Sequence, residues 1–307
     1  MEHDFAMASA VPDASFFGIV LLPTPEWQID RFLAQYEADW GEKPMAVNLS
    51  EAEGVEGAAL QFKEGVVILM HNPTPVPNGE AERAAGNNYV WRGAKAAAAA
   101  HKAHLAIGVG RPDYPEEAQP LEALPPEERS ARFHASAELG TLLVKACASA
   151  LAATNALGLY ANDTVWEPRS YRGATALVSR GILPIPNLVW IGICVNDLGE
   201  LGGWTNGLRP FGLKELELES VADMTPADLQ SFLFDLVAHE LEEGAIFRSG
   251  DRIAYSASEK MLLEAGPGIY RPTGETTLHI VMKRDEAEED EMPESRGPQT
   301  EGGIHLA

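Results

Sequence analysis

Cysteine is scarce in this chain of 307 residues, and long apolar runs are missing. The two cysteines, Cys147 and Cys194, lie far apart, so no disulfide framework is indicated and a reducing cytoplasm is the simplest location. The first residues carry acids where a signal peptide needs positive charge, and no run reaches the roughly 18 to 20 apolar residues that cross a bilayer. We therefore expect a cytoplasmic protein with no membrane segment.

Basic residues are also scarce. The chain holds 23 Lys and Arg against 46 Asp and Glu, a formal net charge of −23. Residues 284–307 contain 8 acids and 2 bases, which leaves −17 on the rest of the chain. A field of this sign repels phosphate backbones, so nucleic acid is not an expected partner. It makes a protein partner with a basic surface, or metal cations, more plausible, although most acidic proteins are simply soluble, which is the interpretation we favour for the charge alone.

The common catalytic motifs are absent from the sequence. It has no G-x-S-x-G, no G-x-x-x-x-G-K-[ST] and no G-x-G-x-x-G after a strand. It also lacks C-x-x-C and H-E-x-x-H, so no metal ligand set and no cofactor are predicted. These absences disfavour enzymes of those mechanisms. The glycine-rich stretch LGELGGWTNG is interpreted as turns between strands.

The first 110 residues show a regular alternation of apolar patterns. They predict, in order, a strand at 16–22, a helix at 26–40, strands at 58–63 and 66–72, a helix at 80–101 and a strand at 104–110. Strand, helix, strand, strand, helix, strand is the order of a ferredoxin-like, or split βαβ, unit. We therefore predict an N-terminal α+β half over residues 1–110.

A proline-rich segment separates this half from the rest. Five prolines at 111–129 predict a linker that leads into a long helix at about 127–156, so 111–156 forms a joining region. A similar order of elements recurs at 157–283, which predicts a C-terminal α+β half. The fold class is then α+β, with two ferredoxin-like halves in pseudo-repeat. Residues 284–307 form an acidic tail that we predict to be disordered.

Two histidines stand three apart in AAAAAHKAHLAIGVG, at residues 96–110. On a helix His101 and His104 would share a face, whereas on a strand they would point to opposite faces. Two ligands are too few for zinc. We favour a structural role in which a helix ends near His101 and passes into a buried strand, and we retain metal binding as the alternative.

The segment KELELES at 214–220 alternates between charged and apolar residues. Glu215, Glu217 and Glu219 therefore share one face of a predicted strand, about 6.6 to 6.8 Å apart in sequence. Such carboxylates can hold a divalent cation or recognise basic side chains. The competing interpretation, which we favour, is a solvated face of a sheet.

A buried carboxylate is possible in LQSFLFDLVAHELEEG, at residues 229–244. Glu240 falls near the middle of the apolar face of the predicted helix. It would either be half-buried with a raised pKa, as a general base is, or lie solvated at a frayed helix end. The solvated alternative is favoured because Gly244, one turn away, is the expected C-cap.

Several segments resemble the bacterial family known as domain of unknown function 4261. They are PTPVPNGE before a Trp-containing helix, HKAHLAI, NALGLYAND, LPIPNLVWIGI and TNGLRPFGLKELELE. The likeness runs discontinuously from about Phe17 to Glu243. Its most specific part is 205–219. The positions that match the family pattern are His101, His104, Phe211, Gly212, Leu213, Glu215 and Glu217.

The resemblance implies a bacterial, cytosolic α+β protein. It also suggests an association with domains that act as immunity or accessory proteins around secreted toxins. The pair His239-Glu240 departs from the family pattern, which argues against a family-wide catalytic role for it. The acidic tail is likewise not part of the resemblance.

Our leading hypothesis is a non-enzymatic acidic protein that binds a protein partner with a basic surface, such as a toxin that it neutralises. No catalytic residues are assigned. The candidate binding residues are His101, His104, Glu215, Glu217, Glu219 and Glu240. The alternative is a metal-assisted hydrolase or small-molecule-binding enzyme in which these side chains converge between the two halves.

Overall fold

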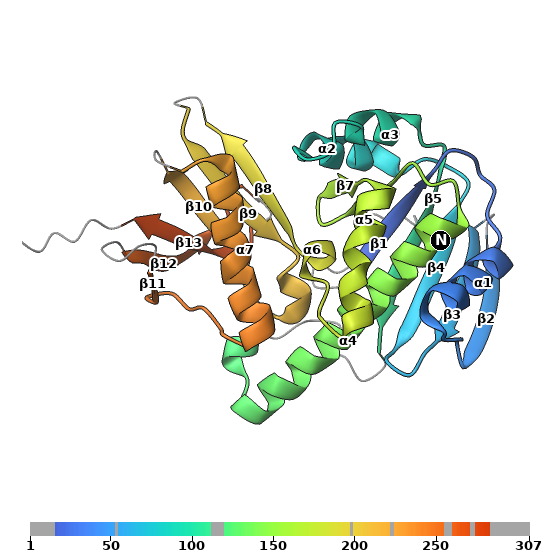
Figure 1. The fold of residues 1–307 in the computed structure, drawn as a ribbon, viewed down its shortest axis with the longest axis horizontal. Coiled ribbons are helices and arrows are strands. Elements are labelled where there is room, and N and C mark those ends of the chain that lie inside the picture. The colour runs from blue at the N-terminus through green and yellow to red at the C-terminus, as the bar shows by residue number, and fades with distance from the viewer. Residues whose placement is uncertain are drawn as a thin grey trace, which may run out of the picture.

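The chain folds around two β-sheets that lie side by side, each covered by helices (Figure 1). The structure is a computed structural model. It describes residues 16–52, 55–111, 120–196, 199–221, 224–254, 260–270 and 274–282. The predicted acidic tail and the central part of the predicted linker, residues 112–119, lie outside these ranges.

The first sheet has seven strands in the order β2-β3-β4-β5-β1-β6-β7, and all neighbours in it are antiparallel. In that order the strands are Ala46–Ala52, Val55–Gln61, Val66–Asn72, Ala103–Gly110, Phe17–Leu22, Gly158–Ala161 and Thr164–Trp166. The central strands β1 and β5 are almost wholly apolar because helices cover both of their faces.

Two groups of helices cover this sheet. On one face lie α1, Ile29–Trp40, and α4, Pro126–Ala153, with α5, Pro168–Ala174, against α4 (Figure 1). On the other face lie α2, Glu80–Gly86, and α3, Ala94–Ala100. Five buried alanines of α2 and α3 pack on the small cluster around Ile19 and Leu21. Their small side chains bring these short helices close to the sheet.

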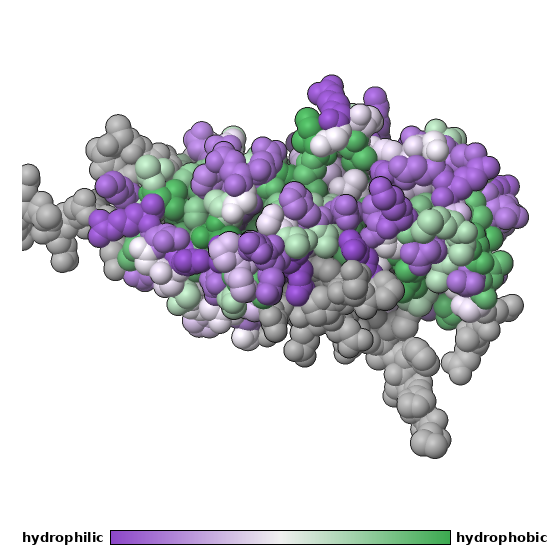
Figure 2. Space-filling view, turned by 90° about the horizontal axis from the view of Figure 1, so that it is seen from below, coloured by the Kyte–Doolittle hydropathy of each residue, from purple (hydrophilic) through white to green (hydrophobic). Residues whose placement is uncertain are grey.

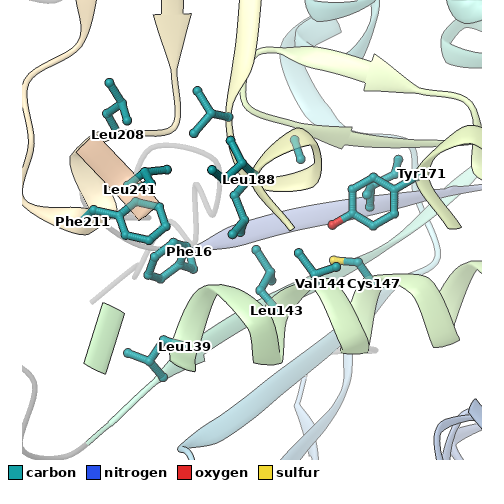
Figure 3. Close-up of a cluster of buried hydrophobic side chains, with 14 of the residues drawn as sticks. Phe16, Leu139, Leu143, Val144, Cys147, Tyr171, Leu188, Leu208, Phe211 and Leu241 are labelled. Atoms are coloured by element: carbon teal, nitrogen blue, oxygen red, sulfur yellow. The ribbon is translucent and has the colours of Figure 1, made fainter. Parts of the chain in front are cut away.

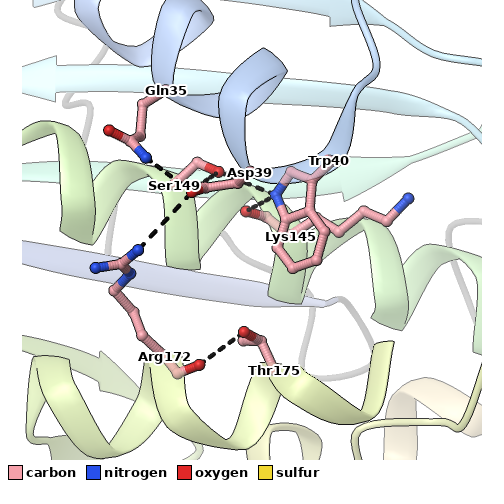
Figure 4. A network of polar contacts seen from close by, with 7 residues as sticks. All are labelled: Gln35, Asp39, Trp40, Lys145, Ser149, Arg172 and Thr175. Atoms are coloured by element: carbon pink, nitrogen blue, oxygen red, sulfur yellow. Dashed lines mark hydrogen bonds and ion pairs between the residues drawn. The ribbon is translucent and has the colours of Figure 1, made fainter. Parts of the chain in front are cut away.

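A polar network joins α1, α4 and α5 (Figure 4). Ser149 donates to the Asp39 carboxylate at 2.8 Å and accepts from the Trp40 indole N–H at 3.0 Å. Arg172 of α5 lies 3.8 Å from the same carboxylate. The network fixes the rotation of α1 on α4, which apolar contact alone leaves less defined.

The second sheet has six strands in the order β11-β12-β13-β10-β9-β8. In that order they are Arg252–Ala254, Lys260–Pro267, Thr276–Met282, Leu216–Val221, Leu201–Asn206 and Trp190–Val195. Only β10 and β13 are parallel neighbours. Helix α7, Pro226–Glu243, lies between them in sequence and packs on β8 and β9. A capping box at Thr225 starts α7, and Gly244 ends it as the sequence predicted, at φ 71°.

Short elements complete the fold. Helix α6 spans Ile185–Leu188 and leads into β8. The 3₁₀ turns are η1 at Pro77–Gly79, η2 at Leu121–Ala123, η3 at Thr175–Arg180 and η4 at Arg209–Phe211.

One hydrophobic core runs through both sheets. Its junction is the edge-to-face pair of Phe16, before β1, and Phe211, in η4, with ring centroids 5.1 Å apart (Figure 3). Leu139 of α4 and Leu188 of α6 lie beside this pair. The two sheets are therefore joined by packed side chains.

Helix α4 is the central element of this core. By length and composition it could cross a membrane, but 67% of its most apolar window is buried inside the fold. From Ser136 onward it contacts the first sheet, α1 and α5. Burial against these elements explains why its apolar residues are not confined to a single stripe.

The α+β class is confirmed, but the ferredoxin-like pseudo-repeat is not. A ferredoxin-like sheet would place β4 beside β1, whereas β5 lies between them. The reason is β2, a strand that the sequence analysis missed. It reverses the chain once more, so that β4 runs parallel to β1 and β5, antiparallel to both, fits between them.

Other boundaries also differ from the prediction. The strands at 158–166, assigned to the C-terminal half, belong to the first sheet, where β6 pairs with β1 and β7 pairs with β6. The predicted helix at 80–101 is two helices, α2 and α3. The glycine-rich stretch interpreted as turns contains β9.

Candidate functional site

The two histidines mark the predicted passage from helix to strand. Helix α3 ends at Ala100, and β5 begins at Ala103. His101 is buried in the connection, where Nε2 accepts the Val76 N–H at 2.8 Å and Nδ1–H donates to the Ala98 carbonyl. One ring nitrogen accepts and the other donates, which is the hydrogen-bonding pattern of a neutral imidazole. His101 thus caps the end of α3 and secures the preceding loop.

His104 also forms a hydrogen bond with the loop that contains Val76. Its Nδ1–H donates to the Thr74 carbonyl at 2.8 Å. Burial lowers the pKa of His104, which this hydrogen bond only partly opposes. The side chain is therefore neutral near pH 7. Both histidines hold residues 74–76 against the start of β5.

A third histidine, His71 of β4, was missed by the sequence analysis. It is buried and stacks on Trp27, with ring centroids 6.5 Å apart. Among the described residues, none forms a hydrogen bond with its Nε2. Burial lowers the pKa of His71, and the nearby Glu56 carboxylate opposes that effect. The signal that would have found it is VVILMHN, in which His71 takes an inward position of the strand.

Glu215 organises a tight loop rather than a ligand site. Its carboxylate accepts the backbone N–H groups of Gly207 and Leu208 at 2.9 and 3.0 Å and the Thr205 hydroxyl at 2.7 Å. A third backbone N–H, that of Arg209 at the start of the 3₁₀ turn η4, donates to the carboxylate at 3.3 Å, so Glu215 accepts the successive backbone donors that lead into this turn. The side chain is buried, so these contacts define its environment.

Glu217 and Glu219 differ from each other. Glu217 is 0% exposed, so the solvated-face interpretation is wrong at this position. One oxygen accepts the Ile269 N–H at 2.7 Å, and the other has no hydrogen-bond partner within the described part of the chain. Tyr270, next along the chain, stacks on Trp204 with ring centroids 5.0 Å apart. The segment 268–270 therefore covers Glu217, whereas Glu219 is exposed.

Glu240 is buried, which corrects the expectation of a solvated helix end. It is 1% exposed, and Oε1 accepts the Phe247 N–H at 3.3 Å, while Oε2 has no hydrogen-bond partner in the described ranges. Burial raises the pKa of Glu240 to about 8, and the negative charge of Glu215 adds to this effect. The residues that follow Gly244 fold back over the carboxylate, which is why the helix end is not solvated.

The candidate residues do not form one site. His101 and His104 belong to the first sheet, and the glutamates belong to the second sheet and α7. Within the described ranges, no group of three or more His, Cys, Asp or Glu side chains lies close enough together to hold a metal ion. Five of the six candidates instead contact backbone groups of their own fold.

The fold and these contacts define an α+β protein in which two sheets share one core. Residues 204–281 match the family model described as a domain of unknown function, DUF4261. The matched segment runs from Trp204, within β9, through β10, α7, β11 and β12 to Val281 in β13. No curated protein and no solved structure matched the chain.

Replacing His101 tests its structural role. We expect His101→Ala to lower the free energy of unfolding by about 1 to 3 kcal/mol, because the buried Val76 N–H loses its acceptor. Urea denaturation measures the effect, and His134→Ala, an exposed position in α4, is the control. Stoichiometric metal in the purified protein that disappears in His101→Ala would contradict this role and favour the hydrolase alternative.

The pKa of Glu240 predicts a pH-dependent stability difference. Below about pH 4.5 the carboxyl is neutral in both folded and unfolded chains, whereas above about pH 8 it must ionise inside the fold. Its contribution to stability therefore falls as pH rises between these values. Glu240→Gln should gain roughly 2 to 4 kcal/mol over the wild type at pH 9 and almost nothing at pH 4.5.

Denaturation of both proteins across this pH range checks the expectation. Glu242→Gln, an exposed position on the same helix, serves as the matched control. An equal stability difference at all pH values would show that Glu240 is solvated.

Proposed function

We propose that this protein is a non-enzymatic binding protein whose acidic surface engages a protein partner with a basic surface. The proposal rests on the positions of the candidate binding side chains. His101, His104 and Glu215 bind backbone of their own fold, and the burial of Glu217 and Glu240 keeps them from a partner. Binding of a partner would therefore rely on exposed side chains.

The charge of the surface supports the same proposal. Helix α7 exposes Asp228, Asp235, Glu242 and Glu243 and contains no Lys or Arg. One of these acids, Glu243, pairs with His239 at 2.9 Å. The remaining acids add to the field of a chain with a net charge of −23. Such a field accelerates encounter with basic proteins and selects against acidic ones.

A toxin is the class of partner that the family resemblance adds to this proposal. The protein would neutralise or accompany it in the cytoplasm. A basic toxin has a charge opposite to that of the acidic surface, so the two proteins would associate quickly at low ionic strength.

Affinity purification tests the proposal. Tagged, nuclease-treated protein from its native cells should recover a basic partner at about 0.05 M salt and lose most of it at about 0.5 M, because salt screens exposed charges. Mass spectrometry identifies the partner. Titration of the purified pair should give the same salt dependence. Recovery of no partner at low salt, or of an acidic partner insensitive to salt, would contradict the proposal.

A further inference from the structure

We infer that the outer edge of β2, with the groove between β2 and α1, binds an extended segment of a protein partner that carries apolar and basic side chains. This inference rests on the proposed function and names the surface and the partner chemistry. It concerns a part of the chain outside the DUF4261 match.

Strand β2 is an edge strand with little of the usual protection. It lies at the end of the first sheet, and its sequence AVNLSEA has no lysine, no proline and a single charged residue, Glu51. Its seven pairs with β3 run without a bulge. Proteins normally block such edges with charges, proline or bulges, because a regular free edge pairs with another strand. Among the described strands, none lies on its outer side.

Apolar side chains are exposed along this edge. Met45, Val47 and Leu49 are 68%, 41% and 66% exposed. Val47 and Leu49 point to the face that α1 covers, since their cross-strand neighbours Leu60 and Ala58 are buried there. Figure 2 shows hydrophobic side chains gathered at the end of the molecule where β2 lies. An added strand would extend this apolar layer by one row.

A groove of about 370 Å³ adjoins the edge. Its lining residues are Trp27, Ile29, Leu49, Ser50, Glu56, Gly57, Ala58 and Leu69. The groove is apolar apart from Ser50 and Glu56, and Glu56 is its one charged residue. A lysine or arginine fits this arrangement because its alkyl stem packs on Trp27 while its charge reaches Glu56.

His71 of β4 lies beside the same groove. It is the cross-strand neighbour of Glu56 and stacks on Trp27. It is also a buried side chain whose Nε2 has no hydrogen-bond partner among the residues that the structure describes. An unsatisfied buried polar atom is uncommon in a folded protein and is frequently a functional feature. Here it adjoins two residues that line the groove.

Charge decides between a foreign partner and a second copy of the chain. Two copies with a net charge of −23 each would repel one another, and their Glu56 side chains would remain without cations. A basic segment removes both costs. The occupant is therefore a partner strand in which apolar residues alternate with lysine or arginine.

Peptide binding tests this inference directly. The probe is a fluorescent seven-residue peptide of alternating lysine and valine, matched to the length of β2, with a glutamate-valine peptide as its counterpart. We expect the lysine peptide to bind and to slow hydrogen exchange of the β2 amides. Leu49→Lys and Glu56→Lys should each weaken binding about tenfold or more. Val195→Lys, at an equally exposed apolar position of the edge strand β8, should not.

The possible outcomes separate the explanations. Equal binding of both peptides, or binding indifferent to Leu49→Lys and Glu56→Lys in variants that fold normally, would overturn the inference. A dimer in sedimentation that Leu49→Lys abolishes would assign the edge to a second copy and also overturn it. If a basic partner is recovered but binds these variants as it binds the wild type, only the inference fails. Recovery of no partner contradicts the proposed function itself.

Discussion

The continuous core between the two sheets is the constraint on which the rest of the structure depends. Phe16 and Phe211 meet edge to face where the sheets join, and α4 extends the same core under β1 and β5. Such a core excludes water from the loops that end on it. Their backbone groups must then find partners inside the protein, because an unsatisfied buried N–H costs on the order of 1 to 3 kcal/mol.

This requirement explains what the polar candidates do. His101, at the end of α3, satisfies the buried N–H of Val76 beside the smaller apolar cluster, and Glu215 satisfies several N–H groups at η4, beside Phe211. Histidine and glutamate often act in catalysis, but here these two side chains accept hydrogen bonds from buried backbone N–H groups. The unusual chemistry lies instead at an edge that nothing in the described chain covers, along β2, where apolar side chains meet a groove with a single carboxylate.

Strong periodic patterns allowed much of the secondary structure to be predicted, whereas elements decided by tertiary contacts were missed. Helices α1 and α7 were predicted from their apolar repeats, and α4 was predicted from its many alanines and leucines, because both are local signals. Strand β9 was missed because of its glycines: Gly203 admits the leucines of α7, and the space above Gly202 is filled by Tyr270. The burial of Glu240 depends on a loop that folds back over it, which no helical pattern can reveal.

The claim that one core unites the molecule can be tested by hydrogen exchange in increasing urea. Pulse labelling with mass spectrometry reports separately on β5 in the first sheet and on β10 in the second. A shared core predicts that both strands lose protection at the same urea concentration. Two well-separated midpoints would mean that the sheets fold independently and would contradict the account.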